Sequence, residues 1–273
     1  MGYDRAAMGA SGDSDLLARI RDSEAWSRAY SEPEPLVTVR IATWNRAELL
    51  VERALPSVFA QTYPHWEVAI VGDACSDDTE ERVAALGDPR IRFQNLPVNG
   101  PYPENLMHRW YVAGVPAMNA ALRMARGQWI APLDDDDEWD DDHLEVLLGA
   151  ALQDRTELVY GRTRCHLHGD LVEQVFGAWP PRRGTIDLGT VLYNAALREF
   201  EHDLDSCLVE EPHDWHLVHR MWDAGVSFKF VDRVVATYHL DHAKEVLMAA
   251  RARRVAKKGA NDGADVSDDD PER

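Results

Sequence analysis

Short apolar runs alternate with segments of helical period over most of the chain, from about residue 35 to residue 242. The run Leu36–Ala42 is rich in β-branched residues and predicts a strand, and Val68–Gly72 predicts a second one. Between them, apolar residues recur at helical spacing over residues 49–59, where Pro56 should kink or split the helix. A strand, a crossover helix and another strand form the unit of a parallel sheet, so this pattern predicts an α/β domain.

The rest of the chain continues the alternation. Further strands are expected at Ile91–Phe93, Trp129–Leu133, Leu158–Gly161, Phe228–Val231 and Val234–Tyr238, and helices at Val115–Arg126, His143–Leu152, Asp214–Ala224 and Ala243–Lys257. Asn45, with Glu48 three residues later, resembles a helix capping box. The stretch NLPVNGPYPENLMHR is rich in Pro, Asn and Gly and predicts a long loop.

The polarity of the two ends sets the expected domain boundaries. Residues 1–34 are mostly polar and are expected to form an N-terminal extension with one weakly amphipathic segment. The main domain is expected to span residues 35–242, followed by a C-terminal helix at 243–258. Residues 259–273 have almost no apolar side chains and predict a disordered acidic tail.

Charge and composition narrow the class of protein. A formal net charge of −19 disfavours a nucleic-acid partner, because the phosphate backbone would be repelled. No apolar run has the length that a membrane span needs, and no secretory signal is seen, so a cytoplasmic protein is expected. The three cysteines form no CxxC pair, which disfavours a disulfide framework or a zinc site. The oligomeric state is left open.

The strongest chemical signal is the acidic run LDDDDEWDDD, which directly follows the apolar strand that ends at Leu133. Its first carboxylates therefore lie at the carboxyl end of the sheet, where open α/β sheets bind ligands. Crowded carboxylates favour a cation, and oxygen ligands suit Mg²⁺ or Mn²⁺ bridged to substrate phosphates. In an extended segment, Asp134 and Asp136 would point to one side, as a metal pair. Asp135 and Asp137 would point to the other, towards ribose or the protein.

Calcium-loop, phosphoryl-aspartate and phosphate-cradle sites are each disfavoured by the residues that they would require. A calcium loop of the EF-hand type would need Gly at the position of Trp139. A phosphoryl-aspartate enzyme would need its nucleophile after the first strand, which ends in ATWNR. The chain has neither GxxxxGK nor GxGxxG, so kinase, ATPase and dinucleotide-binding hypotheses are disfavoured.

Three blocks of sequence together resemble one enzyme family. VTVRIATWNRAELLVERALPSVFAQTYPHWEVAIVGDACSDDT is similar to the opening of family 2 glycosyltransferases, with T-[YW]-N-R after a first strand and an Asp after the second. MNAALRMARGQWIAPLDDDDEW is similar to the DxD segment of that family, and EEPHDWHLVHRMWDAGVSFKFVD to its late acidic helix. The resemblance spans roughly residues 35–242. It implies an A-type glycosyltransferase fold, with a Rossmann-like nucleotide-binding half (about 35–137), an acceptor half (about 138–242) and a mixed, mainly parallel sheet.

The resemblance also implies roles for individual residues. The nucleotide-binding residues would be Thr43, Asn45, Asp73, Asn119, Asp134 and Asp135. Asp134 and Asp136 would form the DxD pair that serves ribose and a Mn²⁺ or Mg²⁺ ion. Asp214, in the HDW motif, would be the general base of an inverting transfer. The donor would be a nucleotide-diphosphate sugar, with a UDP-sugar favoured, and the acceptor is not readable.

The chain departs from the family pattern at three positions. Gly72 precedes Asp73 where the family often has a second Asp, and Met118 stands where an Arg commonly precedes the Asn. His213 stands where an acid often precedes the catalytic Asp. The first two changes would each remove one contact, one to the nucleobase and one to the diphosphate. The third leaves the identity of the general base open.

Several of these residues could instead have a purely structural role. Asp73 could cap a turn, Asp214 could be a helix-start acid favoured by the macrodipole, and Asn45 could be a helix cap as well as a nucleotide ligand. His239 or His242, after the last strand, could close over the metal, and His239 is taken as the candidate ligand. Two other functions also stay open. One is a metal-dependent nucleotide-sugar phosphohydrolase, and the other is an inactive nucleotide-sugar-binding protein of the same fold.

Overall fold

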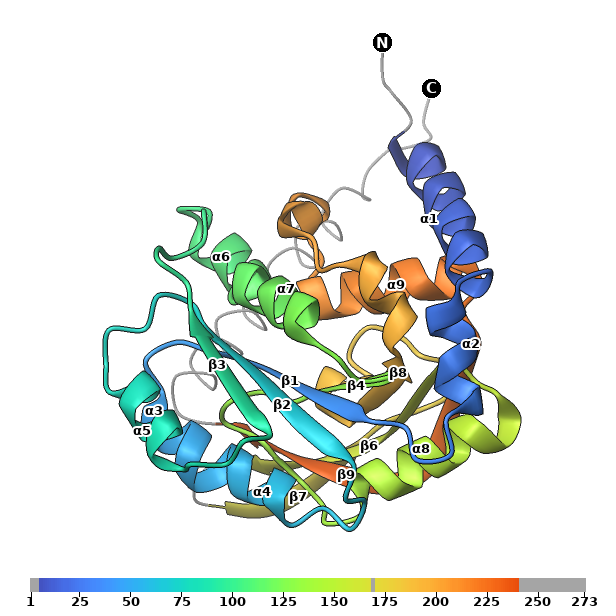
Figure 1. Ribbon diagram of the computed structural model, residues 1–273. Coiled ribbons are helices and arrows are strands. Elements are labelled where there is room, and N and C mark those ends of the chain that lie inside the picture. Colours follow the sequence, from blue (N-terminus) through green and yellow to red (C-terminus); the bar gives the residue numbers. More distant parts are fainter. Residues whose placement is uncertain (1–4, 168–169, 241–273) are drawn as a thin grey trace, which may run out of the picture.

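The computed structural model describes residues 5–167 and 170–240, and one curled sheet forms its centre (Figure 1). The strand order is β3-β2-β1-β4-β8-β6-β9-β5, with β7 paired to β6. The first four strands in this order pair in parallel, whereas β8 joins β4 and β6 in antiparallel. The strands are β1 (Val37–Thr43), β2 (Trp66–Gly72), β3 (Ile91–Asn95), β4 (Trp129–Pro132), β5 (Glu138–Trp139), β6 (Leu158–Leu167), β7 (Asp170–Phe176), β8 (Val191–Asn194) and β9 (Phe228–Leu240).

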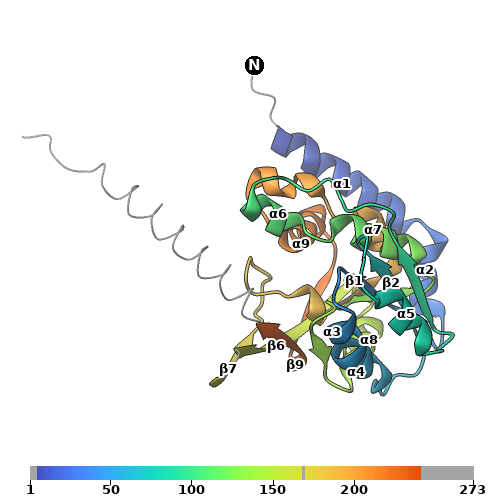
Figure 2. The same cartoon turned by 90° about the vertical axis from the view of Figure 1, so that its left-hand side faces the viewer.

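Helices cover both faces of this sheet. Figure 2 shows α1, α7 and α9 on one side and α4 and α8 on the other. The helices are α1 (Arg5–Arg21), α2 (Glu24–Ser31), α3 (Ala47–Leu49), α4 (Leu55–Phe59), α5 (Thr79–Ala85), α6 (Leu106–Val112), α7 (Val115–Met124), α8 (His143–Asp154) and α9 (His213–Ala224). Shorter turns are the π-helical η1 (Leu50–Ala54) and the 3-10 turns η2 (Leu188–Thr190), η3 (Ala195–Phe200) and η4 (Leu204–Val209). No helix within the described ranges is both long and apolar enough to cross a bilayer.

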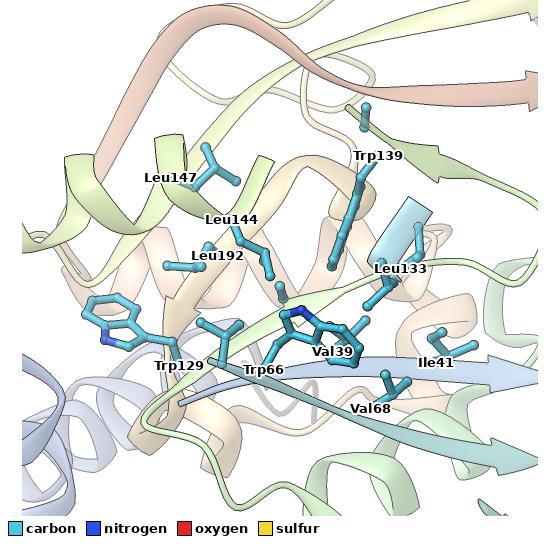
Figure 3. Close-up of a cluster of buried hydrophobic side chains, with 14 of the residues drawn as sticks. Val39, Ile41, Trp66, Val68, Trp129, Leu133, Trp139, Leu144, Leu147 and Leu192 are labelled. Carbon is cyan, nitrogen blue, oxygen red and sulfur yellow. The ribbon is translucent and has the colours of Figure 1, made fainter. Parts of the chain in front are cut away.

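The larger part of the core lies between the sheet and α8. Alternate residues of β1, such as Val39 and Ile41, are fully buried and face this layer, as the period of a strand requires (Figure 3). Leu144 and Leu147 of α8 close it from the other side. Trp139 is buried in the same cluster and donates from Nε1 to the Gly189 carbonyl at 2.7 Å, so its polar atom is satisfied.

The opposite face has two smaller clusters. Ala117, Ala120 and Ala121 of α7 pack on Val71, and these small side chains let the helix lie close to the parallel strands. Leu17 and Ile20 of α1 are buried with residues of β6, β8 and α9. The segment expected as a polar extension therefore contributes to the core of the main domain.

Most expected elements are present, with some corrections. Pro56 lies near the start of α4, and the helix is split as expected: the Leu55 N–H bonds to the Leu50 carbonyl in a π turn just before the proline. The two late strands are one, β9, and β6 runs six residues beyond Gly161. The expected loop at residues 95–109 contains the start of α6, whose first backbone N–H groups are capped by the Asn105 side chain. The expected helix Ala243–Lys257 and the tail at 259–273 lie outside the described residues.

A buried carboxylate ties the N-terminal helices to the sheet. Glu157 is 1% exposed and accepts from Nε and Nη2 of Arg21, each at 2.7 Å, and from the Ser227 N–H at 2.8 Å. Trp26 of α2 donates to the same carboxylate at 3.0 Å. Glu157 lies 131 positions after Trp26 of α2 and 136 positions after Arg21 of α1, so these bonds hold both N-terminal helices against the start of β6.

We expect Glu157→Ala to lower the free energy of unfolding by about 2–4 kcal/mol, because it leaves several buried donors without an acceptor. Glu32→Ala is a matched control, since Glu32 only pairs at 3.9 Å with exposed Arg28, and it should change stability by less than about 0.5 kcal/mol. Burial raises the pKa of Glu157, but the bonds from Arg21 and Ser227 outweigh burial and lower it. The stabilisation should therefore be full above the unfolded-state pKa of about 4.3 and disappear as the pH falls through the folded value. Urea titrations across pH would show this, and equal losses in both variants would contradict it.

Candidate functional site

The carboxyl ends of β1, β2 and β4 bring the candidate residues to one edge of the sheet. Thr43 pairs in register with Gly72, and the Asp73 N–H donates to the Thr43 carbonyl at 2.8 Å. Asp134 follows β4 by two residues on the other side of β1. The chain leaves β1 towards β2 and β3 and then returns to β4 on the opposite side, which makes the crevice between β1 and β4 the topological switch point of the sheet.

Among the described residues, Asp73 Oδ1 is buried and has no hydrogen-bond partner, on a residue that is 4% exposed. The Thr43 hydroxyl, on a residue that is 3% exposed, lies near Asp135, and its hydrogen bond works against the burial that raises the pKa of that carboxyl. A buried polar atom without a partner is costly, so Asp73 Oδ1 indicates a place where a ligand completes the hydrogen bonds.

Asn45 links the ends of the first two strands. It has a left-handed backbone with φ of 52°, and its Oδ1 accepts from the N–H groups of Ser76 at 2.8 Å and Asp77 at 3.3 Å. The expected capping box is wrong, because this side chain bonds to the loop after β2. The helix begins at Ala47, and its N-cap residue, Arg46, makes no side-chain cap bond. Whether Asn45 also contacts a nucleotide stays a prediction.

The acidic run is not extended, which corrects the expected alternation of its side chains. It turns at Asp135 and Asp136, and Nη1 of Arg46 contacts Asp135 Oδ1 at 3.1 Å and Asp136 Oδ2 at 2.7 Å. Both aspartates are buried, whereas Asp134 is exposed. Burial, with the neighbouring Asp136, raises the pKa of Asp135 to about 6 against the opposing charge of Arg46.

Asp137 serves the protein itself. Its Oδ1 accepts from the His239 backbone N–H at 2.8 Å, which fastens the acidic run to β9. The His239 ring is near the run, with Nε2 at 3.1 Å from Glu138 Oε1. Its expected role as a metal ligand stays a prediction, and His242 lies outside the described residues.

Two carboxylates from distant segments, Asp187 and Asp214, lie near Asp134 of the acidic run. Asp214 lies in the first turn of α9, and its Oδ1 accepts from the Trp215 N–H at 2.6 Å. Asp187 precedes η2, where its Oδ1 accepts from the Gly189 N–H at 2.9 Å. Burial, followed by the charges of Asp134 and Asp214, raises the pKa of Asp187 to about 6. The sequence did not single out Asp187; its only local signal is an Asp two residues before a Gly.

No group of three or more His, Cys, Asp or Glu side chains in residues 5–167 and 170–240 is arranged to hold a metal by itself. The carboxylates fit a hard cation by chemistry, since Mg²⁺ and Mn²⁺ prefer oxygen ligands. Such ions commonly take one or two protein carboxylates and complete their shell with water and substrate phosphate. That Asp134 and Asp136 hold such an ion stays a prediction.

A pair of histidines supports the start of α9. His213 Nδ1 lies 3.0 Å from His202 Nδ1, and burial lowers the pKa of both imidazoles, so they are neutral at pH 7. Asn119 bonds the His202 backbone in both directions, donating to its carbonyl at 2.8 Å and accepting from its N–H at 2.9 Å. The structure thus gives Asn119 a positioning role, and its expected contact with a nucleotide stays a prediction. His213 places a neutral ring beside Asp214, at the position where the family often has an acid.

The segment from residue 99 to residue 114 folds back over Asp73. The Tyr102 hydroxyl contacts Asp73 Oδ2, and the Asn99 side chain contacts the Asp73 carbonyl. Nearby, a groove of about 520 Å³ is lined by Leu96, Pro101, Val115, Pro116, Asn119, Arg123, His202, Asp203, Leu204 and Asp205.

Comparison with known proteins agrees with this architecture. The sequence model of the family described as "Glycosyl transferase family 2" matches residues 38–175. The Escherichia coli glucosyltransferase WfgD is 31% identical over 126 residues, which cover 46% of this chain and 45% of that protein. The chain thus matches less than half the length of that relative.

Two solved structures share the fold. The mannosyltransferase PcManGT from Pyrobaculum calidifontis, in complex with GDP-Man and Mn²⁺, has a TM-score of 0.59 at 18% identity. The match covers 95% of this chain and 77% of the PcManGT chain. S. aureus TarS 1-349 in complex with UDP has a TM-score of 0.56 at 16% identity, and the match covers 75% of this chain and 60% of the TarS chain. These similarities confirm the expected A-type glycosyltransferase fold.

We expect Asp187→Asn to stabilise the protein at alkaline pH. The folded-state pKa of Asp187, about 6, lies above its usual 3.8, so stability is lost as the pH rises between these values. Asn keeps an oxygen for the Gly189 N–H and removes the charge, so the gain should reach about 2–3 kcal/mol at pH 8 and vanish near pH 3. Denaturant titrations at several pH values measure this difference, with Asp15→Asn, exposed on α1, as the control. A gain that stays constant across pH would contradict the buried charge of Asp187 as its cause.

Proposed function

Because this chain belongs to glycosyl transferase family 2, we propose that it transfers a sugar from a nucleotide-diphosphate donor to the hydroxyl group of an acceptor, with a divalent metal and with inversion at the anomeric carbon. The observation that carries this proposal is that Asp73 and the acidic run at Asp134–Asp137 follow β2 and β4 at one edge of the sheet, with Asp214 near enough to Asp134 that both charges act on Asp187. The donor half is placed in residues 35–137 and the acceptor half in residues 138–242.

The donor would lie across the carboxyl ends of β1, β2 and β4. Thr43, Asn45, Asp73 and Asp135 are proposed for the nucleoside, and Asp73 Oδ1, which has no partner among the described residues, supports this proposal. The complexes of the two structural neighbours, one with UDP and one with GDP-Man and Mn²⁺, also support a nucleotide ligand and a divalent ion. A UDP-sugar is the favoured donor.

Asp134 and Asp136 would hold Mn²⁺ or Mg²⁺, which supplies Lewis-acid stabilisation of the leaving diphosphate. The protein contributes its own cation next to that position, because Arg46 contacts Asp136 at 2.7 Å and Asp135 at 3.1 Å. A chain of net charge −19 needs such local positive charge to accept a polyanionic donor. His239, at the edge of the acidic run, is a further proposed ligand.

Asp214 would act as the general base. Its carboxylate would take the proton of the acceptor hydroxyl as that oxygen attacks the anomeric carbon, while the bond to the diphosphate breaks on the opposite face. The neutral His213–His202 pair supports the start of α9 without adding a charge beside the base.

We expect a nucleoside diphosphate to stabilise the protein only when divalent metal is present. At a ligand concentration one hundred times the dissociation constant, the gain in unfolding free energy should be about 2.7 kcal/mol. Thermal-shift measurements with UDP, Mn²⁺, both, and UDP with EDTA would test the metal bridge. Equal stabilisation by UDP in EDTA would show that the carboxylates need no metal to accept the diphosphate.

We expect Asp214→Asn and Asp136→Asn to fail in different ways. Asp214→Asn keeps the shape and removes the basic oxygen, so turnover should fall by at least ~10²-fold while nucleotide affinity changes only a few-fold. Asp136→Asn removes a metal ligand, so both nucleotide affinity and turnover should fall. Circular dichroism must be unchanged in both variants. Near-normal turnover in Asp214→Asn together with a loss of turnover in Glu211→Gln would show that Glu211 is the general base instead. Release of free sugar without an acceptor would favour a hydrolase.

A further inference from the structure

The outer side of α9 carries aromatic side chains at helical spacing. Trp215, His219 and Trp222 recur at i, i+4 and i+7, so they lie on one face of the helix. The rings of Trp215 and His219 stack with their centroids 5.3 Å apart. The buried residues of α9 are Leu217, Val218 and Met221. The aromatic residues therefore face away from the core that anchors the helix.

A fourth aromatic residue, Trp179, extends this surface from another segment. Its ring meets the Trp222 ring edge-on at 5.5 Å, and Trp222 meets Phe228 at 5.3 Å. Even so, Trp179 is 53% exposed and Trp222 is 38% exposed. Neighbouring exposed apolar side chains mark binding surfaces, whereas single ones are common everywhere. Together these side chains form an aromatic face, made of Trp179, Trp215, His219 and Trp222.

The loop that carries Trp179 is held in place beside that residue. The Ala178 carbonyl accepts from the Tyr160 hydroxyl at 2.7 Å, and the Ala178 N–H donates to the Thr185 carbonyl at 3.3 Å. Two prolines follow Trp179 directly, and their rings restrict the backbone further. The exposed indole is therefore presented in a fixed position, which reduces the entropy that a ligand must overcome to bind it.

The aromatic face begins beside the proposed general base and leads away from it. Trp215 directly follows Asp214, and Trp222 lies about 12 Å from Asp214 along the helix axis and about 80° around it. The segment 179–187 follows the same stretch of α9. At one end Trp179 meets Trp222, and at the other Asp187 lies close enough to Asp214 for that charge to act on it. A short oligosaccharide would span this stretch.

We propose that the aromatic face is a carbohydrate subsite, which binds the sugar residues of an oligosaccharide acceptor that lie beyond the one reacting at Asp214. This inference rests on the proposed function only in taking the bound chain to be the acceptor. The C–H groups on the flat side of a pyranose ring are slightly positive, and they fit the negative face of an indole. Several rings at intervals along α9 suit a chain of sugars better than a single one.

Charge favours a neutral sugar chain over other occupants of this face. The His219 ring lies between two carboxylates, with Nδ1 at 3.3 Å from Glu211 Oε1 and Nε2 at 3.4 Å from Asp223 Oδ2. These acids can accept hydrogen bonds from sugar hydroxyls, but in a chain of net charge −19 they would be repelled by an anionic membrane surface. In a symmetric contact between two copies of the chain, the same acids would face each other.

Titration of the ¹⁵N-labelled protein with neutral oligosaccharides tests the subsite without nucleotide or metal. The probes are cellohexaose, chitohexaose and mannohexaose, with glucose as the single-ring control. The indole N–H signals of Trp179, Trp215 and Trp222, assigned with Trp→Phe variants, should shift together for at least one hexasaccharide, with a Kd of about 1 mM or lower. Glucose should bind much more weakly, because one ring covers only part of the face. Shifts with no hexasaccharide, or equal affinity for glucose, would overturn the proposal.

Variants of the exposed indole test its contribution. Trp179→Ala should weaken hexasaccharide binding about tenfold, whereas Trp179→Phe keeps a ring and should stay within about threefold of the wild-type value. Phe59→Ala is the matched control, because Phe59 is 40% exposed and packs at 6.0 Å on Trp66, on the other side of the sheet (Figure 2). Its affinity should be unchanged. Unchanged affinity in Trp179→Ala, or equal weakening in the control, would overturn the proposal.

Two further measurements test the other occupants, and both should be negative. Co-sedimentation with phosphatidylglycerol vesicles that Trp179→Ala abolishes would assign the face to a membrane. A dimer in sedimentation velocity that Trp179→Ala abolishes would assign it to a second copy of the chain. Either result would overturn the proposal. Failure of UDP with Mn²⁺ to stabilise the protein would instead reject the proposed function, since the hexasaccharide titration uses neither.

Discussion

Parallel pairing of β1 with β2 on one side and with β4 on the other is the constraint on which the site depends. The register sets Thr43 beside Gly72 and Arg40 beside Pro132, so the chain emerges from all three strands at one edge. Three loops that are far apart in sequence must then share a small space. Asn45 bridges two of them through the backbone of Ser76 and Asp77, and Arg46 bridges to the third through Asp135 and Asp136. The strand register therefore determines the chemistry at this edge.

The site holds several carboxylates close together, and positive side chains compensate only part of their negative charge. Arg46 compensates Asp135 and Asp136, whereas the pKa of the half-buried Asp187 is raised to about 6 by desolvation and by two other acids. On β1, Arg40 is 1% exposed, and two of its nitrogens have no hydrogen-bond partner among the described residues. A cation and a diphosphate bound together would add positive charge at the acids without a large change in net charge. This balance supports the proposal of a metal-bridged ligand rather than a free anion.

Local sequence predicted the parts of the fold that depend on local rules. The β-branched run after Leu36 and the effect of Pro56 were readable because strand period and the missing proline N–H act over a few residues. Thr43, Asp73 and Asp134 lie at the ends of β1, β2 and β4, as expected, for the same reason. Asp187 and Tyr102 were missed because their importance comes from contacts with Asp134, Asp214 and Asp73, which only the tertiary fold creates. The capping role given to Asn45 failed because a bond to the distant Ser76 replaced the local one.

Crystals grown with UDP and Mn²⁺, with diffraction collected at the manganese absorption edge, test the central claim most directly. We expect one manganese peak beside Asp136, with the diphosphate next to it and the uracil beside Asp73. Nucleotide bound elsewhere, for example in the groove between Pro116 and His202, or manganese away from the acidic run, would contradict it.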